Sequence, residues 1–186
     1  MSAQDSKLFV ISGPSGAGKG TLVTRVRERR SNLGLTVSAT TRAPRKGEVD
    51  GVNYFFLTRE EFDRRVANGE FVEWAEVHGN CYGTLVSEVT SKLASGASLI
   101  LEIDVQGALQ VKERFPEAVL IFIKPPSLEV LRERLVGRGT ETPETIELRM
   151  ANAADELALA DRYDDVVVND DLDRATDELV RVLDMH

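Results

Sequence analysis

Near the start of the chain, glycines and a lysine recur at a spacing that suits phosphate binding. The segment reads GPSGAGKGT, which contains the pattern G-x-x-x-x-G-K. Backbone N–H groups must turn inward to surround phosphate oxygens, and glycine adopts the required dihedral angles at least cost. The lysine adds a mobile positive charge to the outer phosphates. We therefore predict a nucleoside triphosphate site formed by Gly13, Pro14, Ser15, Gly16, Ala17, Gly18, Lys19, Gly20 and Thr21.

One position of this loop departs from the usual pattern. Ser or Thr normally follows the lysine and holds Mg²⁺, but this chain has Gly20 there, and its first hydroxyl belongs to Thr21. Mg²⁺ gives up its waters reluctantly and often relies on nucleotide phosphates. We therefore expect the metal to be bound through phosphates and water. A glycine-rich turn without a ligand is the alternative, which the complete motif between a strand and a helix disfavours.

A second set of polar residues lies between positions 36 and 89. Arg42 and Arg45 lie on either side of a proline, and two guanidinium groups beside a rigid turn suit the doubly charged phosphate of a mononucleotide. The phenols of Tyr54 and Tyr82 could donate to the same phosphate. Glu73 places a carboxylate in an otherwise apolar strand. Each of these alone could be an ordinary surface residue, so the argument depends on their combination.

The elements that must position these residues alternate along the chain. Short apolar runs bounded by polar residues predict strands buried on both faces. The predicted strands are residues 7–12, 99–103, 119–123 and 165–168. The predicted helices are residues 21–30, 106–114, 127–136, 144–160 and 172–183. This alternation predicts an α/β fold with a parallel sheet and helices on both of its faces.

Residues from about 36 to 89 interrupt this alternation. Alternating, aromatic strand patterns at residues 53–57 and 71–77 flank a helix with a capping box from Thr58 to Glu61. We interpret this region as an inserted α+β subdomain in a single domain whose core is residues 1–35 and 90–186. A polar loop at residues 137–142 opens a short lid, about residues 137–147, in which Thr142 caps a helix that Pro143 begins.

Composition limits the class of protein. Hydrophobic residues make up 42% and charged residues 29%, as in an ordinary globular domain of 186 residues. The net charge of −8 argues against a nucleic-acid partner. No apolar run is long enough for a membrane span, and the polar start is unlike a signal peptide. With a single cysteine, Cys81, these features predict a cytoplasmic protein with small-molecule partners. The oligomeric state is left open.

With these residues in view, the chain resembles the guanylate kinases, which are nucleoside monophosphate kinases with a phosphate-binding loop. The resemblance runs from Leu8 to about Leu183. It rests on the segments VSATTRAPRKGEVDGVNYFF, GEFVEWAEVHGNCYGT, LILEIDVQG, GRGTET and VVVNDDLD, in the family's order. The departures from the commonest family pattern are Gly20, Glu102 and Cys81, and none of them removes a charge from the site.

The resemblance implies that ATP and GMP react to give ADP and GDP, with Mg²⁺ as cofactor. The residues expected to hold the GMP phosphate are Arg42, Arg45, Tyr54 and Tyr82. The residues expected to read guanine are Ser38, Glu73 and Thr84, assisted by Glu102. Asp104 is expected at the GMP site and would also influence the waters bound to Mg²⁺. The catalytic set is Lys19, Arg42, Arg134, Arg138 and Arg149, with Asn169 near adenine.

Two alternatives stay open at the level of sequence. A guanylate-kinase-like module that binds proteins without catalysis would be expected to lose the loop lysine, which this chain keeps as Lys19. A kinase for another mononucleotide would not need a carboxylate at Glu73. Guanine presents two adjacent N–H donors to such a carboxylate, whereas adenine would present a lone pair and leave a buried polar group unpaired.

Overall fold

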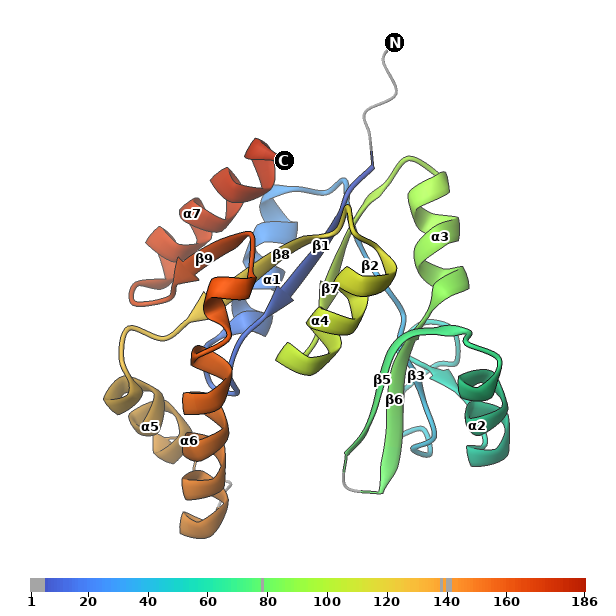
Figure 1. The fold of residues 1–186 in the computed structure, drawn as a ribbon, viewed down its shortest axis with the longest axis horizontal. Helices are drawn as coiled ribbons and strands as arrows, with labels where there is room; N and C mark the ends of the chain where they lie inside the picture. Colours follow the sequence, from blue (N-terminus) through green and yellow to red (C-terminus); the bar gives the residue numbers. More distant parts are fainter. Residues whose placement is uncertain (1–5, 78, 138, 140–141) are drawn as a thin grey trace.

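The computed structural model describes residues 6–77, 79–137, 139 and 142–186 (Figure 1). A five-stranded sheet has the order β2-β7-β1-β8-β9, and every pairing in it is parallel. Its strands are β1 (Leu8–Ser12), β2 (Leu33–Leu35), β7 (Ser98–Glu102), β8 (Val119–Lys124) and β9 (Asp165–Val168). The central strand β1 is buried along its whole length, as its continuous apolar sequence predicts.

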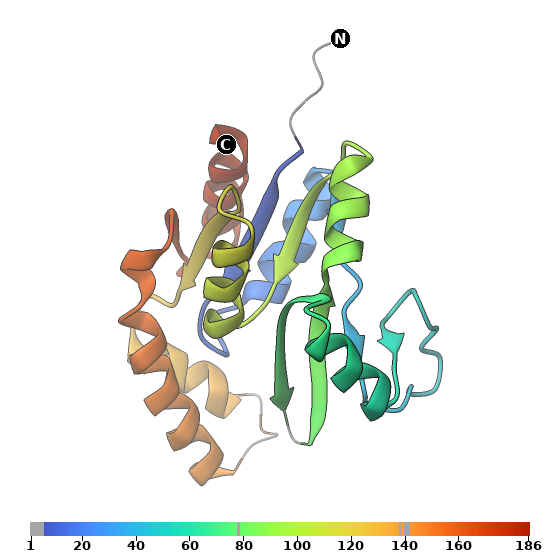
Figure 2. The same cartoon turned by 45° about the vertical axis from the view of Figure 1, so that its right-hand side comes forward.

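Helices cover both faces of this sheet, which confirms the predicted fold class (Figure 2). Alternate residues of β1 enter two different cores: Phe9 and Ile11 pack with one set of helices, and Leu8 and Val10 with the other. The first core includes α1 (Lys19–Arg29) and α7 (Leu172–Met185). The second includes α3 (Val86–Ala94) and α4 (Val105–Arg114).

A second sheet has four strands in the order β4-β3-β6-β5. Its strands are β3 (Ala39–Thr40), β4 (Phe55–Phe56), β5 (Phe71–Val77) and β6 (Asn80–Leu85). One face packs against α2 (Arg59–Ala67) through a small core that contains Phe62, Phe71 and Cys81. Cys81, one of the departures from the commonest family pattern, is thus buried in this core. Because side chains alternate along a strand, Tyr82 and Thr84 lie on the opposite face of β6.

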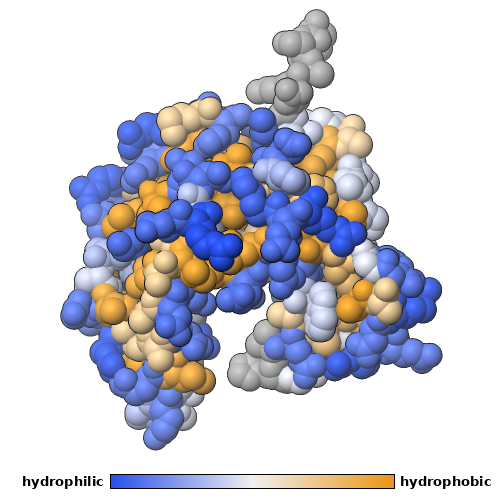
Figure 3. Space-filling view, viewed as in Figure 1, coloured by the Kyte–Doolittle hydropathy of each residue, from blue (hydrophilic) through white to orange (hydrophobic). Residues whose placement is uncertain are grey.

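Two further helices form a separate projection. α5 (Leu128–Gly137) packs against α6 (Pro143–Leu157) through a core of their own. A short 3₁₀ helix, η1 (Ala160–Arg162), then leads into β9. Figure 1 shows α5 and α6 on one side of the parallel sheet and the second sheet on the other. Figure 3 shows an open notch between these two projections.

Most predicted elements are present, with shifted ends. α1 begins at Lys19, two positions before the predicted start, so the helix already includes the end of the loop motif. α6 ends at Leu157 instead of residue 160, where η1 begins. The predicted caps are confirmed, because the hydroxyls of Thr58 and Thr142 accept hydrogen bonds from the backbone N–H groups of Glu61 and Thr145. Within the described residues, no helix is long and apolar enough to cross a membrane.

Candidate active site

The predicted phosphate loop joins the C-terminal end of β1 to the start of α1. Gly18 has a φ of 90°, and a Cβ atom there would lie 2.4 Å from Nδ2 of Asn169. Gly13 approaches β8 closely, since a Cβ atom on it would lie 2.2 Å from the carbonyl oxygen of Ile123. Both positions therefore exclude any side chain larger than hydrogen, which is the physical reason for glycine here.

Lys19 folds back over this loop. Its Nζ donates to the carbonyl oxygens of Gly13 at 2.5 Å and Pro14 at 3.1 Å. The ammonium group is thus held close to the backbone that would surround phosphate oxygens. An ammonium group is a compact point charge on a flexible stem, so it can reach a phosphate from this position.

Asn169 and Arg134 support the outer side of the loop. Nδ2 of Asn169 donates to the carbonyl oxygen of Ala17 at 2.8 Å, and Arg134 of α5 donates to the backbone oxygen of Asn169 at 2.7 Å. They line a groove of about 340 Å³ whose walls are Gly16, Gly18, Thr21, Arg134, Asn169, Asp170 and Leu172. The predicted adenine residue therefore lies beside an open groove, with its own amide nitrogen bonded to the loop.

Arg149 reaches the loop from α6. Its guanidinium donates to the hydroxyl of Ser15, so α6 is tied directly to the phosphate loop. Arg134 and Arg149 come from the two helices of one projection and both contact the loop or its support. Arg138, the third predicted arginine of this set, lies outside the described residues, as do residues 140–141 of the predicted lid.

Two carboxylates stand where β7 ends beside the loop. A Cβ atom on Gly20 would lie 3.5 Å from Oε1 of Glu102, so this carboxylate faces the position where a loop hydroxyl is usual. Loss of hydration raises the pKa of Glu102, and the Lys19 cation opposes that rise. Asp104 caps α4 by accepting from the N–H of Gly107 at 2.8 Å. Its placement thus has a structural cause as well as the predicted functional one.

The predicted guanine-reading residues meet on the polar face of the second sheet. Glu73 of β5 is paired in register with Thr84 of β6, and the Thr84 hydroxyl donates to Oε1 of Glu73 at 2.8 Å. Glu73 is 7% exposed. Ser38 directly precedes β3 and is half-buried. Because Ala39 pairs with Gly83 in an antiparallel register, the next position along the register brings Ser38 beside Thr84.

The environment of Glu73 alters its ionisation. Burial raises the pKa of Glu73 from 4.5 to about 7, with a smaller rise from the negative charge of Asp104 and an opposing effect of the Thr84 hydrogen bond. A Cβ atom on Gly107 would lie 3.2 Å from Oε2 of Glu73. The carboxylate therefore adjoins the first turn of α4, at the junction between the two sheets.

Three of the four predicted GMP-phosphate residues, Arg42, Tyr54 and Tyr82, lie together. The guanidinium of Arg42 is 5.4 Å from the centre of the Tyr54 ring, and the rings of Tyr54 and Tyr82 are 6.2 Å apart, edge to face. Arg45 is exposed, and its backbone N–H donates to Glu48 at 2.6 Å. Glu48 also accepts from Arg42 at 2.8 Å. Sequence reasoning assigned no role to Glu48, since nothing in its spacing distinguishes it from a surface acid.

The comparisons with known proteins agree with one another. The guanylate kinase family model matches residues 5–186. A guanylate kinase from Gloeobacter violaceus is 57% identical over 96% of this chain and 87% of its own length. One from Halalkalibacterium halodurans is 52% identical over 98% of this chain and 90% of its own. A crystal structure of guanylate kinase from Anaplasma phagocytophilum matches with a TM-score of 0.73 and 37% identity, over 97% of this chain and 85% of that one.

Proposed function

The chain belongs to the guanylate kinase family, and from this premise we propose which residues carry each part of its reaction. The enzyme transfers the γ-phosphoryl group of ATP to GMP and releases ADP and GDP. One observation supports the division of labour best. A buried carboxylate, Glu73, lies on the second sheet, whereas the intact phosphate loop joins β1 to α1 of the parallel sheet. The loop would hold ATP, and the polar face of the second sheet would hold GMP.

Recognition of guanine follows from the hydrogen-bonding groups around Glu73. The N1–H and N2–H groups of guanine are adjacent donors, and one ionised carboxylate can accept both. Thr84 already bonds one oxygen of Glu73 and fixes the direction of the carboxylate. Ser38 would complete this end of the site, with Glu102 and Asp104 closing it from the parallel sheet. Adenine would leave the buried carboxylate facing a lone pair, which costs enough free energy to reject it.

Phosphoryl transfer in this site would need positioning and charge more than acid–base chemistry. The attacking oxygen belongs to the phosphate of GMP and is already ionised, so no side chain has to remove a proton. Arg42, Arg45, Tyr54 and Tyr82 would orient that phosphate. Lys19, Arg134, Arg149 and Arg138 would surround the transferring group and offset the charge that its oxygens carry in a loose transition state. Asn169 would lie at the adenine end of the ATP site.

The oxygen ligands beside the loop fit Mg²⁺, which the guanylate kinase family generally uses. The hydroxyl of Thr21 and the carboxylates of Glu102 and Asp104 are hard oxygen donors, the kind that Mg²⁺ prefers. We propose that they hold the ion's waters while ATP supplies its direct ligands. Glu102 would serve in place of the absent hydroxyl, because its carboxylate faces Gly20. Bound there, Mg²⁺ would neutralise charge on the phosphates.

A phosphorylation assay with GMP, AMP, CMP and UMP as acceptors tests this function directly. We expect GMP to be phosphorylated at least about 10⁴-fold more efficiently than AMP, because a carboxylate built to accept two donors rejects the base that lacks them. Comparable use of another mononucleotide would overturn the guanine assignment. A folded protein that phosphorylates none of the four would instead favour the non-catalytic binding module. We also propose that the enzyme works in the cytoplasm, in keeping with its free, buried Cys81.

A further inference from the structure

Glu48 stands at the centre of the irregular segment between β3 and β4. Its carboxylate accepts from Nη2 of Arg42 through both oxygens, at 2.8 and 3.1 Å. The same carboxylate accepts from the backbone N–H of Arg45 at 2.6 Å, and the N–H of Glu48 donates to the carbonyl of Arg45 at 3.0 Å. One acidic side chain thus fixes one of the two predicted phosphate-binding arginines and the backbone of the other.

The guanidinium of Arg42 is held from several directions. Nη1 donates to the carbonyl oxygen of Ala43 at 2.8 Å. The guanidinium lies 5.4 Å from the ring centre of Tyr54 and 6.0 Å from that of Phe56. The side chains of Arg42 and Glu48 are only 15% and 19% exposed, so their contact is shielded from water better than a surface ion pair. Tyr82 is a further polar neighbour of this guanidinium.

We propose that Glu48 is a positioning residue of the GMP-phosphate site, holding Arg42 and the turn at Arg45 in the geometry that receives the phosphate. This inference rests on the proposed function, since it takes the polar face of the second sheet as the GMP site. Glu48 touches neither substrate. It acts by restricting a long, flexible side chain before the ligand arrives, so that less conformational entropy is lost on binding.

A role opposite to positioning, in which Glu48 competes with the phosphate of GMP, would have a different consequence. A carboxylate beside two arginines could act as a stand-in for the phosphate and compete with it. Removal of the charge would then strengthen GMP binding. If Glu48 positions Arg42, removal of the charge weakens GMP binding. The two roles therefore differ in the sign of one measured change.

The experiment is Glu48→Gln, assayed for phosphorylation of GMP and for inhibition by guanosine. Glutamine keeps the size of the side chain and one acceptor oxygen but loses the charge that holds Nη2 of Arg42. We expect KM for GMP to rise roughly tenfold, with kcat and KM for ATP within about twofold of wild type, since one charge-assisted hydrogen bond is worth about that factor. Guanosine has no phosphate, so its inhibition constant should not change. Glu48→Asp keeps the charge with a shorter reach and should give a smaller rise.

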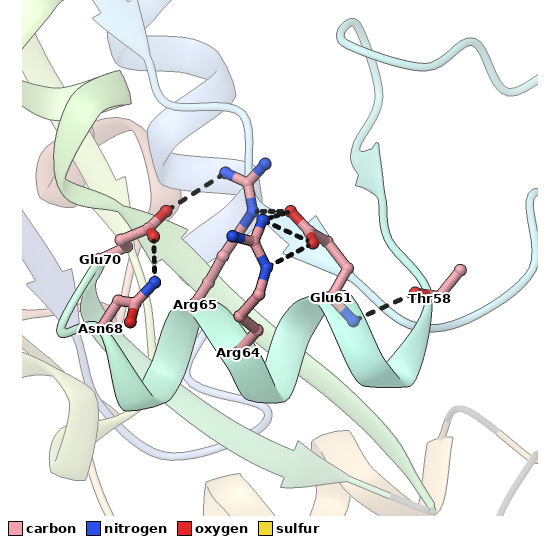
Figure 4. Close-up of polar contacts among 6 residues, drawn as sticks. All are labelled: Thr58, Glu61, Arg64, Arg65, Asn68 and Glu70. Atoms are coloured by element: carbon pink, nitrogen blue, oxygen red, sulfur yellow. Dashed lines mark hydrogen bonds and ion pairs between the residues drawn. The ribbon is translucent and has the colours of Figure 1, made fainter.

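Glu61 offers a matched control on α2. Its carboxylate also bonds two arginines of the same helix, Arg64 at 2.7 Å and Arg65 at 2.7 Å (Figure 4). Glu61→Gln makes the same chemical change in the same subdomain, away from the polar face of the second sheet. KM for GMP should be unchanged in this variant, which separates a local effect of Glu48 from a general weakening of the subdomain.

Three results would overturn the proposal. These are a lower KM for GMP in Glu48→Gln, an unchanged KM, and an equal loss of guanosine binding. If Glu48→Gln does not fold, the test is the Glu48→Asp variant with the same three readouts. Failure of wild-type enzyme to phosphorylate GMP would count against the proposed function instead, so the two failures are distinguishable.

Discussion

Glu73 is the buried carboxylate to which we assign both the specificity for guanine and a pH response. It is the only one of the predicted guanine-reading residues that carries a charge and is almost fully buried. Burial of an ionisable group costs free energy unless a partner compensates, and Thr84 compensates only in part. The remaining compensation would come from guanine itself. This makes Glu73 the residue whose change should affect GMP most selectively.

We expect Glu73→Gln to reduce kcat/KM for GMP by roughly 30- to 1,000-fold, about 2–4 kcal/mol, with little effect on ATP binding. The neutral amide keeps one acceptor but turns an NH₂ group toward the donors of guanine. Steady-state kinetics with each substrate varied in turn measures this. Glu76→Gln, on the same strand but in an exposed pair with Arg59, is the control. Equal losses for GMP and ATP would contradict the role of Glu73.

The raised pKa of Glu73 predicts a pH dependence of GMP use. Its pKa is about 7 in the folded protein, and the carboxylate accepts guanine donors only when ionised. As pH rises from about 5.5 to 8.5, kcat/KM for GMP should therefore rise through a step near 7. The GMP phosphate also titrates near pH 6, but that step should persist in Glu73→Gln while the step near 7 disappears. Identical profiles for the two proteins would refute the assignment.

The same pKa affects the stability of the unliganded protein. Between 4.5 and about 7, folded protein holds more protons on Glu73 than unfolded chain does. The contribution of Glu73 to the free energy of unfolding therefore falls as pH rises through this window, and it is constant below 4.5 and above about 7. If Glu73 reads guanine as proposed, the ionised acceptor at neutral pH therefore comes with a lower free energy of unfolding.

Lys19 is the residue on which the reaction itself should depend. We expect Lys19→Ala to lower kcat by about 10³-fold or more, because it removes a charge from the transferring oxygens. The ammonium also bonds the carbonyls of Gly13 and Pro14, so thermal unfolding must show that the variant is folded. Lys92→Ala, which removes the lysine of an ion pair with Glu88 on α3, is the control. Near-normal turnover by folded Lys19→Ala would refute the assignment of the loop.

The sequence predicted the roles of some single residues better than those of others, for a physical reason. Glu73 lies on a strand that the sequence predicted at residues 71–77, and the structure pairs it with Thr84 on β6, a strand that was not predicted. Glu48 lies in an irregular segment where no periodicity relates position to direction. Its contact with Arg42 depends on the path of the whole turn. A residue that acts through another residue leaves no motif of its own.

At the scale of elements, the phosphate loop depends on its packing against β9 and the segment after it. We expect Gly18→Ala to weaken ATP binding more than tenfold, because the new Cβ would need a φ of 90° and would lie 2.4 Å from Nδ2 of Asn169. Calorimetric titration with ATP measures this. Gly96→Ala has a similar φ of 85° but open space around its Cβ. It should cost about 1 kcal/mol of stability without affecting ATP, and equal ATP affinity in both variants would contradict the clash.

Element by element, the sequence predicted best the strands that form continuous apolar runs. β1, β8 and β9 are apolar runs, and their positions were predicted to within one residue at each end. β2 and β3 have three and two residues, too few for any alternation, and were not predicted. β6, with six residues, and α3 were also missed. α3 spans the predicted boundary at residue 89 because it packs on the parallel sheet after β6 has ended. Pairing partners, not local patterns, define such elements.

For the whole molecule, the main feature is the notch between the second sheet and the α5–α6 projection (Figure 3). The proposed ATP contacts come from the loop, α5 and α6, and the proposed GMP contacts come from the second sheet. Transfer requires the two phosphates to meet with water excluded. The arginines do not all repel one another across the notch, because Arg42 is paired with Glu48. We therefore expect the two ligands, which add negative charge between the projections, to drive closure.

We accordingly predict that GMP and a non-hydrolysable ATP analogue together bring α2 closer to the parallel sheet, and that either ligand alone gives a smaller change. Fluorescent labels on cysteines introduced at Glu60 of α2 and Arg181 of α7, both exposed, would report this distance. The natural cysteine, Cys81, is buried and should not compete for label. GMP with Glu73→Gln, at a concentration that saturates wild type but not the variant, is the control. A distance that does not shorten with both ligands would refute closure of the second sheet, while the kinase assignment would stand on the phosphate loop and Glu73.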